Sequence, residues 1–148
     1  MRLFLTLFLA ATFSVNAGVL DELKETPATK YDLGKMQLEI FSAFTTQKAK
    51  GDSIKNTKFD FYNTSVIEQN NRLGLKVSFS GKSKYLTQEQ CNSLHKVTTN
   101  FFPTEKLAKN MWPRLDEEKY TQLSSELMLV TELVDENNHS LTIKCGDI

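Results

Sequence analysis

The hydrophobic positions of the chain change their spacing along its length, and the first regular stretch is helical. The positions that recur at intervals of three and four are Leu33, Met36, Ile40, Ala43 and Phe44. This spacing predicts a helix that begins near Thr29 and buries these side chains. A strand is the alternative, because Met36, Leu38 and Ile40 also alternate and Gly34 is a poor helix residue.

The next stretch of the chain has the two-residue alternation of β-strands. It starts at Phe59 and Phe61 and changes phase near Asn63, which indicates a β-bulge. A second run then alternates over 73–79. The Asn-rich segment 69–72 between the two runs has turn chemistry, since asparagine tolerates the left-handed backbone conformation. The sequence therefore predicts a β-hairpin.

The second half of the chain repeats the change from helical to strand spacing. Thr87 and Gln90 form a capping box, and the stripe that follows consists of Cys91, Leu94, Val97, Thr98 and Phe101. Pro103 ends this helix, and short helices are predicted over 105–110 and 116–123. An apolar run over 127–134, a turn over 135–138 and an alternating C-terminus predict a second hairpin.

These elements predict an α+β fold. We expect a mainly antiparallel sheet of about four strands, built from two hairpins, with two or three helices packed on one face in the order helix, hairpin, helix, hairpin. Residues 29–148 have the length of one domain.

The N-terminus has the pattern of an export signal. Arg2 precedes an apolar stretch over 3–13, and small residues end at Ala17. The sequence therefore predicts a signal peptide at 1–17, a flexible lead-in over 18–28 and a protein that is periplasmic or secreted. The apolar stretch is too short to span a bilayer, although an uncleaved N-terminal anchor remains the alternative.

The charge balance removes one class of partner. The chain has 18 Lys and Arg against 18 Asp and Glu, with a pI near 6.7. A nucleic-acid binder needs a basic excess to displace counterions from phosphates, so we expect no nucleic-acid partner.

The two cysteines, Cys91 and Cys145, are expected to form a disulfide in an oxidising compartment. In the chain-entropy model such a crosslink stabilises by about 4 kcal/mol. The alternative is a reactive or zinc-binding thiol. Cys91 and His95 share a helical face, and His139 and Cys145 lie in the second hairpin. No catalytic motif is present, and we expect no cofactor and no bound metal.

Two segments are apolar on both faces of their predicted strands. They comprise Leu127, Met128, Leu129 and Val130 in one case and Phe59, Phe61 and Tyr62 in the other. Something must cover them: the 104–123 segment with Met111 and Trp112, a second copy of the chain, or a protein partner.

The function expected from these patterns is that of an exported, non-catalytic binding module that uses an apolar sheet face or edge for a protein partner or for self-association. One alternative is a small secreted enzyme that uses Cys91 and His95. Another is a carrier of a small ligand in a pocket lined by Phe59, Phe61 and Phe79.

Overall fold

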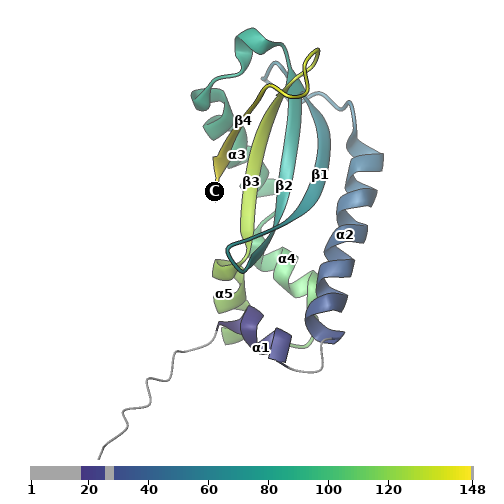
Figure 1. Cartoon of the computed structure of the whole chain (residues 1–148), viewed down its shortest axis with the longest axis vertical. Coiled ribbons are helices and arrows are strands. Elements are labelled where there is room, and N and C mark those ends of the chain that lie inside the picture. Colours follow the sequence, from purple (N-terminus) through teal and green to yellow (C-terminus); the bar gives the residue numbers. More distant parts are fainter. Residues whose placement is uncertain (1–17, 26–28, 148) are drawn as a thin grey trace, which may run out of the picture.

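A computed structural model describes residues 18–25 and 29–147, and it shows an α+β fold with a four-stranded sheet (Figure 1). The predicted signal peptide at 1–17 lies outside the described residues. The helices are α1 (Val19–Glu25), α2 (Thr29–Ala49), α3 (Gln88–Phe101), α4 (Thr104–Met111) and α5 (Glu117–Glu126), with a 3-10 turn η1 at Ser83–Tyr85. The strands are β1 (Phe59–Gln69), β2 (Arg72–Gly81), β3 (Met128–Asp135) and β4 (Thr142–Gly146).

The sheet is mixed, and the prediction of a mainly antiparallel sheet is wrong. The predicted number of two or three helices and the order helix, hairpin, helix, hairpin are also wrong, because the described residues form two α-helices before the first hairpin and three between the hairpins. The strand order of the sheet is β1-β2-β3-β4, and the two outer pairs are antiparallel hairpins. The central pair, β2 and β3, is parallel. The reason is the connection between the hairpins: α3, α4 and α5 bring the chain back to the end of the sheet where β2 began, and a crossover of this length permits parallel pairing.

The local signals of the first hairpin are confirmed. The register of β1 against β2 shifts between Phe61 and Asn63, where the phase of the alternation changes. Asn70 and Asn71 both have positive φ, at 52° and 60°, as a two-residue type I′ turn requires.

The start of α3 is also confirmed, because Thr87 caps the helix by accepting a hydrogen bond from the backbone N–H of Gln90. The sequence thus predicted these boundaries correctly.

The helix at α2 is confirmed, but its buried face is the opposite of the one predicted. Its buried residues are Tyr31, Gly34, Leu38 and Ser42, whereas Leu33, Met36, Ile40 and Phe44 are 47–61% exposed. On this face Gly34 packs against the ring of Trp112 and Ser42 hydrogen-bonds to Thr64 of β1, so the apolar stripe points outward. Hydrophobic spacing alone could not predict this.

The first described residues form a helix where the sequence predicted a flexible lead-in. The α1 side chains Val19, Leu20 and Leu23 are buried. The Glu126 carboxylate of α5 accepts hydrogen bonds from the backbone N–H groups of Val19 and Leu20, both at 2.8 Å. A carboxylate at a helix N-terminus satisfies otherwise unpaired N–H groups, so α5 anchors this helix.

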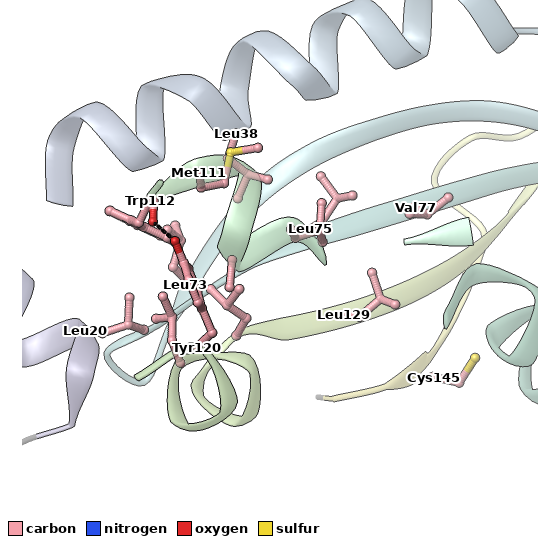
Figure 2. Packing of buried hydrophobic residues seen from close by; sticks show 14 of the residues in the cluster. Leu20, Leu38, Leu73, Leu75, Val77, Met111, Trp112, Tyr120, Leu129 and Cys145 are labelled. Atoms are coloured by element: carbon pink, nitrogen blue, oxygen red, sulfur yellow. Dashed lines mark hydrogen bonds between the residues drawn. The ribbon is translucent and has the colours of Figure 1, made fainter. Parts of the chain in front are cut away.

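The helices pack on one face of the sheet, and α4 fills the lower half of that face. In Figure 2, Trp112 and Met111 lie between α2 and the strands, near Leu75. The Tyr120 hydroxyl donates to the Trp112 carbonyl at 2.7 Å, and this bond ties α5 to the end of α4. Helix α4 is too short to cover the other end of the sheet, where the candidate site lies.

Candidate binding cleft

An apolar cleft of about 600 Å³ lies between α2 and α3, over the upper half of the helix-bearing sheet face. Its floor is Phe61 of β1 and Phe79 of β2. One wall is the last turns of α2, and the other is α3 with Phe101 and Phe102. The volume falls in the range of about 300–1,000 Å³ that is typical of small-molecule sites.

Buried hydroxyl groups fix the position of the α2 wall. Ser42 Oγ donates to Thr64 Oγ1 at 2.9 Å, and Thr64 Oγ1 donates to the Ser42 carbonyl at 2.7 Å. The backbone N–H of Thr64 donates to Thr46 Oγ1 at 2.9 Å. These three residues hold α2 against β1, at the edge of the sheet, and so away from α3.

The opposite wall is fixed to the other edge of the sheet. Cys91 of α3 and Cys145 of β4 are at disulfide distance, with 2.15 Å between their sulfur atoms. His95 Nδ1 lies 3.0 Å from Thr131 Oγ1, and Thr131 Oγ1 donates to Thr98 Oγ1 at 3.1 Å. Helix α3 is therefore fastened to β3 and β4, and the cleft is the space left between two helices held at opposite edges.

The row of hydrogen bonds that runs from His95 through Thr131 and Thr98 also defines the tautomer of His95. The Thr98 hydroxyl donates to the Leu94 carbonyl, which can only accept, so Thr98 accepts from Thr131. The Thr131 proton is then already used, and His95 Nδ1 must donate to Thr131. His95 thus serves as a donor that orients α3.

The floor of the cleft is aromatic. Phe61 and Phe79 are register partners, and their rings meet edge to face with 6.1 Å between centroids. Phe102 makes a similar contact with Phe41 of α2 at 6.0 Å. Phe101, beside it, is 73% exposed, although the sequence predicts it on the buried stripe of α3. Because α3 contacts the sheet through Cys91, Leu94 and Thr98, Phe101 lies at the margin of that face and lines the cleft.

The polar groups of the cleft are concentrated in the loop between α2 and β1. Asp52, Ser53 and Lys55 line the cleft there. Ser53 Oγ donates to Asp60 Oδ1 at 2.6 Å. Lys55 is the basic residue among those that line the cleft. The lining thus combines an apolar interior with a few polar groups at one end, as small-molecule sites commonly do.

The residues that the sequence predicted as an interaction surface are mostly covered by the chain itself. Leu127, Met128, Leu129, Val130, Phe59 and Phe61 are each at most 6% exposed. Met111 and Trp112 line a small hollow together with Leu127 and Met128, which is the internal cover considered above. Tyr62 is half-buried, and its ring lies 5.2 Å from that of His139.

The structure does not assemble the proposed zinc or thiol site. Cys91 is paired with Cys145, and His139 contacts Tyr62 rather than His95. Across 18–25 and 29–147, no group of three or more His, Cys, Asp or Glu residues is arranged to hold a metal ion. With Cys91 bound to Cys145, it has no thiolate to act as a nucleophile.

The second sheet face carries an ionic cluster around the buried carboxylate of Glu132. Glu132 accepts a hydrogen bond from Ser78 at 2.9 Å, and the ammonium groups of Lys76 and Lys144 lie 3.1 and 3.7 Å from its carboxylate. These residues come from β2, β3 and β4. Cross-strand contacts of this kind stabilise the register of the sheet.

Sequence reasoning identified part of the cleft. Phe61 and Phe79 of its predicted pocket form the floor, whereas Phe59 is buried and does not line the cleft. The sequence predicts Val97 and Phe101 on the buried stripe of α3, but both line the cleft. The sequence offers one signal for this outcome, because both residues lie at the edge of the apolar stripe, where a side chain can point away from the core.

Comparisons with known proteins identify no relative. No family model matches the chain, and neither the curated proteins nor the solved structures include a significant match. In the part of the chain that the structure describes, no helix combines the length and the apolar character needed to cross a bilayer.

Proposed function

We propose that this protein is an exported, non-catalytic binding module whose ligand site is the cleft between α2 and α3, and that its ligand is a small apolar molecule. The observation that carries this proposal is the apolar cleft of about 600 Å³ with Phe61 and Phe79 as its floor.

The exposure of the cleft residues supports this proposal. A phenylalanine that is 73% exposed, as Phe101 is, gains little from folding, whereas it would lose most of its contact with water beside a bound apolar ligand. The floor needs no rearrangement, because both floor rings are already held in the sheet. A preformed apolar site avoids part of the ordering cost of binding.

The cysteines support the export part of the proposal. Disulfides persist in oxidising compartments and are rare in the cytosol, and Cys91 and Cys145 are at disulfide distance. The signal-like pattern at 1–17 points the same way. N-terminal sequencing of the protein recovered from the periplasm or medium tests this part, since a chain that still begins at Met1 in the cytosol contradicts it.

The binding site is tested by filling the cleft. Ala49 lines the cleft from α2, and Ala49→Trp places an indole in that space. The matched control is Ala43→Trp on the exposed side of the same helix. We expect the first variant to abolish binding of an apolar fluorescent probe such as 1-N-phenylnaphthylamine, and the second to retain it.

A second variant keeps this test valid if Ala49→Trp does not fold. Phe101→Ala removes an exposed wall of the cleft and leaves the core intact. We expect it to weaken probe binding about threefold to tenfold, in line with the loss of about 1 kcal/mol of apolar contact. Probe binding that neither variant alters would overturn the proposed site.

A second candidate function, self-association, is favoured by the outward stripe of α2. Leu33, Met36, Ile40 and Phe44 form one continuous row on the face opposite the sheet, and each is about half exposed. A second copy of this chain would cover the row by packing its own α2 against it. Four residues from each helix bury less than the roughly 1,600 Å² of a standard interface, so such a dimer would be weak.

Light scattering over a concentration series tests this second candidate. We expect the apparent mass to rise toward that of a dimer as the concentration increases, and Ile40→Ser to prevent the rise without loss of stability. A constant monomer mass for the unaltered chain at millimolar concentration would contradict self-association.

A further inference from the structure

We propose, on the basis of the binding function above, that the ligand of the cleft is a single-chain amphiphile with an anionic head, whose alkyl tail lies over Phe61 and Phe79 and whose head lies at Lys55. Free fatty acids and lysophospholipids share this chemistry.

The asymmetry of the cleft indicates an amphiphile rather than a wholly apolar molecule. Its floor and its α3 wall are apolar, including Phe79, Val97 and Phe101, whereas Asp52, Ser53 and Lys55 line it from the α2–β1 loop. A ligand with one apolar part and one polar end matches this distribution. A hydrocarbon would make no use of the charged groups of the loop, and a small polar ligand would leave the exposed Phe101 ring in contact with water.

Lysines are concentrated at this end of the domain. They are Lys48, Lys50, Lys55, Lys58, Lys82 and Lys84. The backbone places them together, because Phe59 and Gly81 are register partners and the N–H of Gly51 donates to the Phe61 carbonyl at 2.8 Å. None of the six makes an ion pair with a described residue, although three of them lie over aromatic rings.

Two acidic side chains of the same end accept hydrogen bonds from neutral groups, which leave their negative charge in place. Asp60 accepts a hydrogen bond from Ser53, and Asp135 accepts from the backbone N–H groups of Asn137 and Asn138. Asp52 is the acidic side chain that lines the cleft itself. The six lysines still outnumber the nearby carboxylates of Asp52, Asp60, Asp135 and Glu136, and this positive balance favours an anionic head over a cationic one.

Lys55 is the lysine best placed to meet the head. It is the lysine that lines the cleft, and it belongs to the loop whose backbone pairs with the start of β1, where the Ile54 N–H donates to the Phe59 carbonyl at 3.0 Å. The loop is thus fixed relative to the floor. A carboxylate or phosphate at Lys55 leaves the attached chain directed across Phe61.

Isothermal titration calorimetry with four ligands of equal chain length tests the head group. The ligands are decanoate, decanoyl lysophosphatidylglycerol, decanol and decyltrimethylammonium, each below its micelle concentration. We expect both anionic ligands to bind about threefold to tenfold more tightly than decanol, as a partly exposed ion pair provides. The tighter of the two anionic ligands identifies the source of the amphiphile.

A chain-length series tests the tail. Each methylene that enters an apolar site contributes about 0.8 kcal/mol, which corresponds to about fourfold in affinity. We expect the dissociation constant to fall by that factor per added carbon from octanoate to decanoate. An affinity that does not change with chain length would overturn the placement of the tail.

The variant Lys55→Ala connects the head group to its residue. We expect it to reduce decanoate affinity to that of decanol, and the matched control Lys96→Ala, which replaces an exposed lysine outside the cleft lining, to leave both affinities unchanged. If Lys55→Ala leaves the preference for decanoate intact, the inference is overturned.

The two levels of the proposal fail in different ways. If decanol and decanoate bind equally, or if decyltrimethylammonium binds most tightly, the anionic head is refuted while the apolar cleft stands. If none of the four ligands binds, or if Ala49→Trp leaves their binding unchanged, the proposed function itself is refuted.

Discussion

Phe61 and Phe79 face each other across β1 and β2, with their rings edge to face and 6.1 Å between centroids. Both belong to the helix-bearing face of the sheet and are almost fully buried, at 6% and 3% exposure, and they lie at the bottom of the cleft between α2 and α3. The pair is therefore both part of the core and the floor of the cleft.

This double role predicts different effects for two phenylalanines of the cleft. Phe79 is 3% exposed, so Phe79→Ala should lower the free energy of unfolding by about 3–5 kcal/mol, as large core deletions do. Phe101 is exposed, so Phe101→Ala should change it by less than about 0.5 kcal/mol. Urea unfolding followed by circular dichroism measures both values. A loss of several kcal/mol in Phe101→Ala would show that this ring is packed in the core.

Gly34 and Trp112 make a second close contact. A Cβ atom at Gly34 would overlap the indole ring of Trp112, whose N–H donates to the Lys30 carbonyl at 2.9 Å. Replacing a glycine inside a helix by alanine usually stabilises the protein by about 1 kcal/mol. Here we expect the opposite sign: Gly34→Ala should destabilise the protein by about 1–3 kcal/mol.

A double-mutant cycle assigns that effect to the indole. Trp112→Phe leaves more room above position 34, so Gly34→Ala should cost less in the Trp112→Phe background than in the original chain. Thermal unfolding of the four proteins gives the coupling. Additive effects would show that the loss at Gly34 has another origin.

The pair Cys91 and Cys145 should account for a large share of the stability. The two residues are 54 apart in the sequence, and in the chain-entropy model the crosslink stabilises by about 4 kcal/mol. We expect dithiothreitol to shift the urea midpoint of the unaltered protein sharply downward. The double variant Cys91→Ala with Cys145→Ala should start from the lower midpoint and show no response to the reductant. A midpoint that is insensitive to reduction in both proteins would contradict a stabilising disulfide.

The sequence predicted the elements with local signals and not the way in which they assemble. Asn70 and Asn71 determine their turn through backbone conformation alone, and Thr87 caps its helix through one neighbouring N–H group. The parallel pairing of β2 with β3 depends on the path of three helices. No local pattern encodes that path.

The orientation of α2 shows the same limit. Leu33 and Ile40 have the spacing of a buried stripe, but the buried side of α2 is built from contacts of Gly34 with Trp112 and of Ser42 with Thr64, which are distant in the sequence. Hydrophobic periodicity assumes that the most apolar face meets the core. In α2 the orientation depends on the close contacts of Gly34 and Ser42 with their partners. The cleft lies beside this helix, and for that reason it could be predicted only in part.

The turn between β3 and β4 should make stability depend on pH through Asp135. Its carboxylate accepts hydrogen bonds from the backbone N–H groups of Asn137 and Asn138, at 2.8 and 2.7 Å. These bonds hold the pKa of Asp135 below its ordinary value of 3.8, and a hydrogen bond from Ser83 acts in the same direction.

Because the folded pKa is the lower one, the contribution of Asp135 to stability is complete above its ordinary pKa and is lost as the pH falls through the folded value. Asp135→Asn does not titrate. The difference in unfolding free energy between the original chain and this variant should therefore be largest near pH 7 and narrow below pH 3.8. Urea unfolding from pH 7 to pH 2.5 measures it. A difference that stays constant over this range would show that the carboxylate is not held in its charged form by the turn.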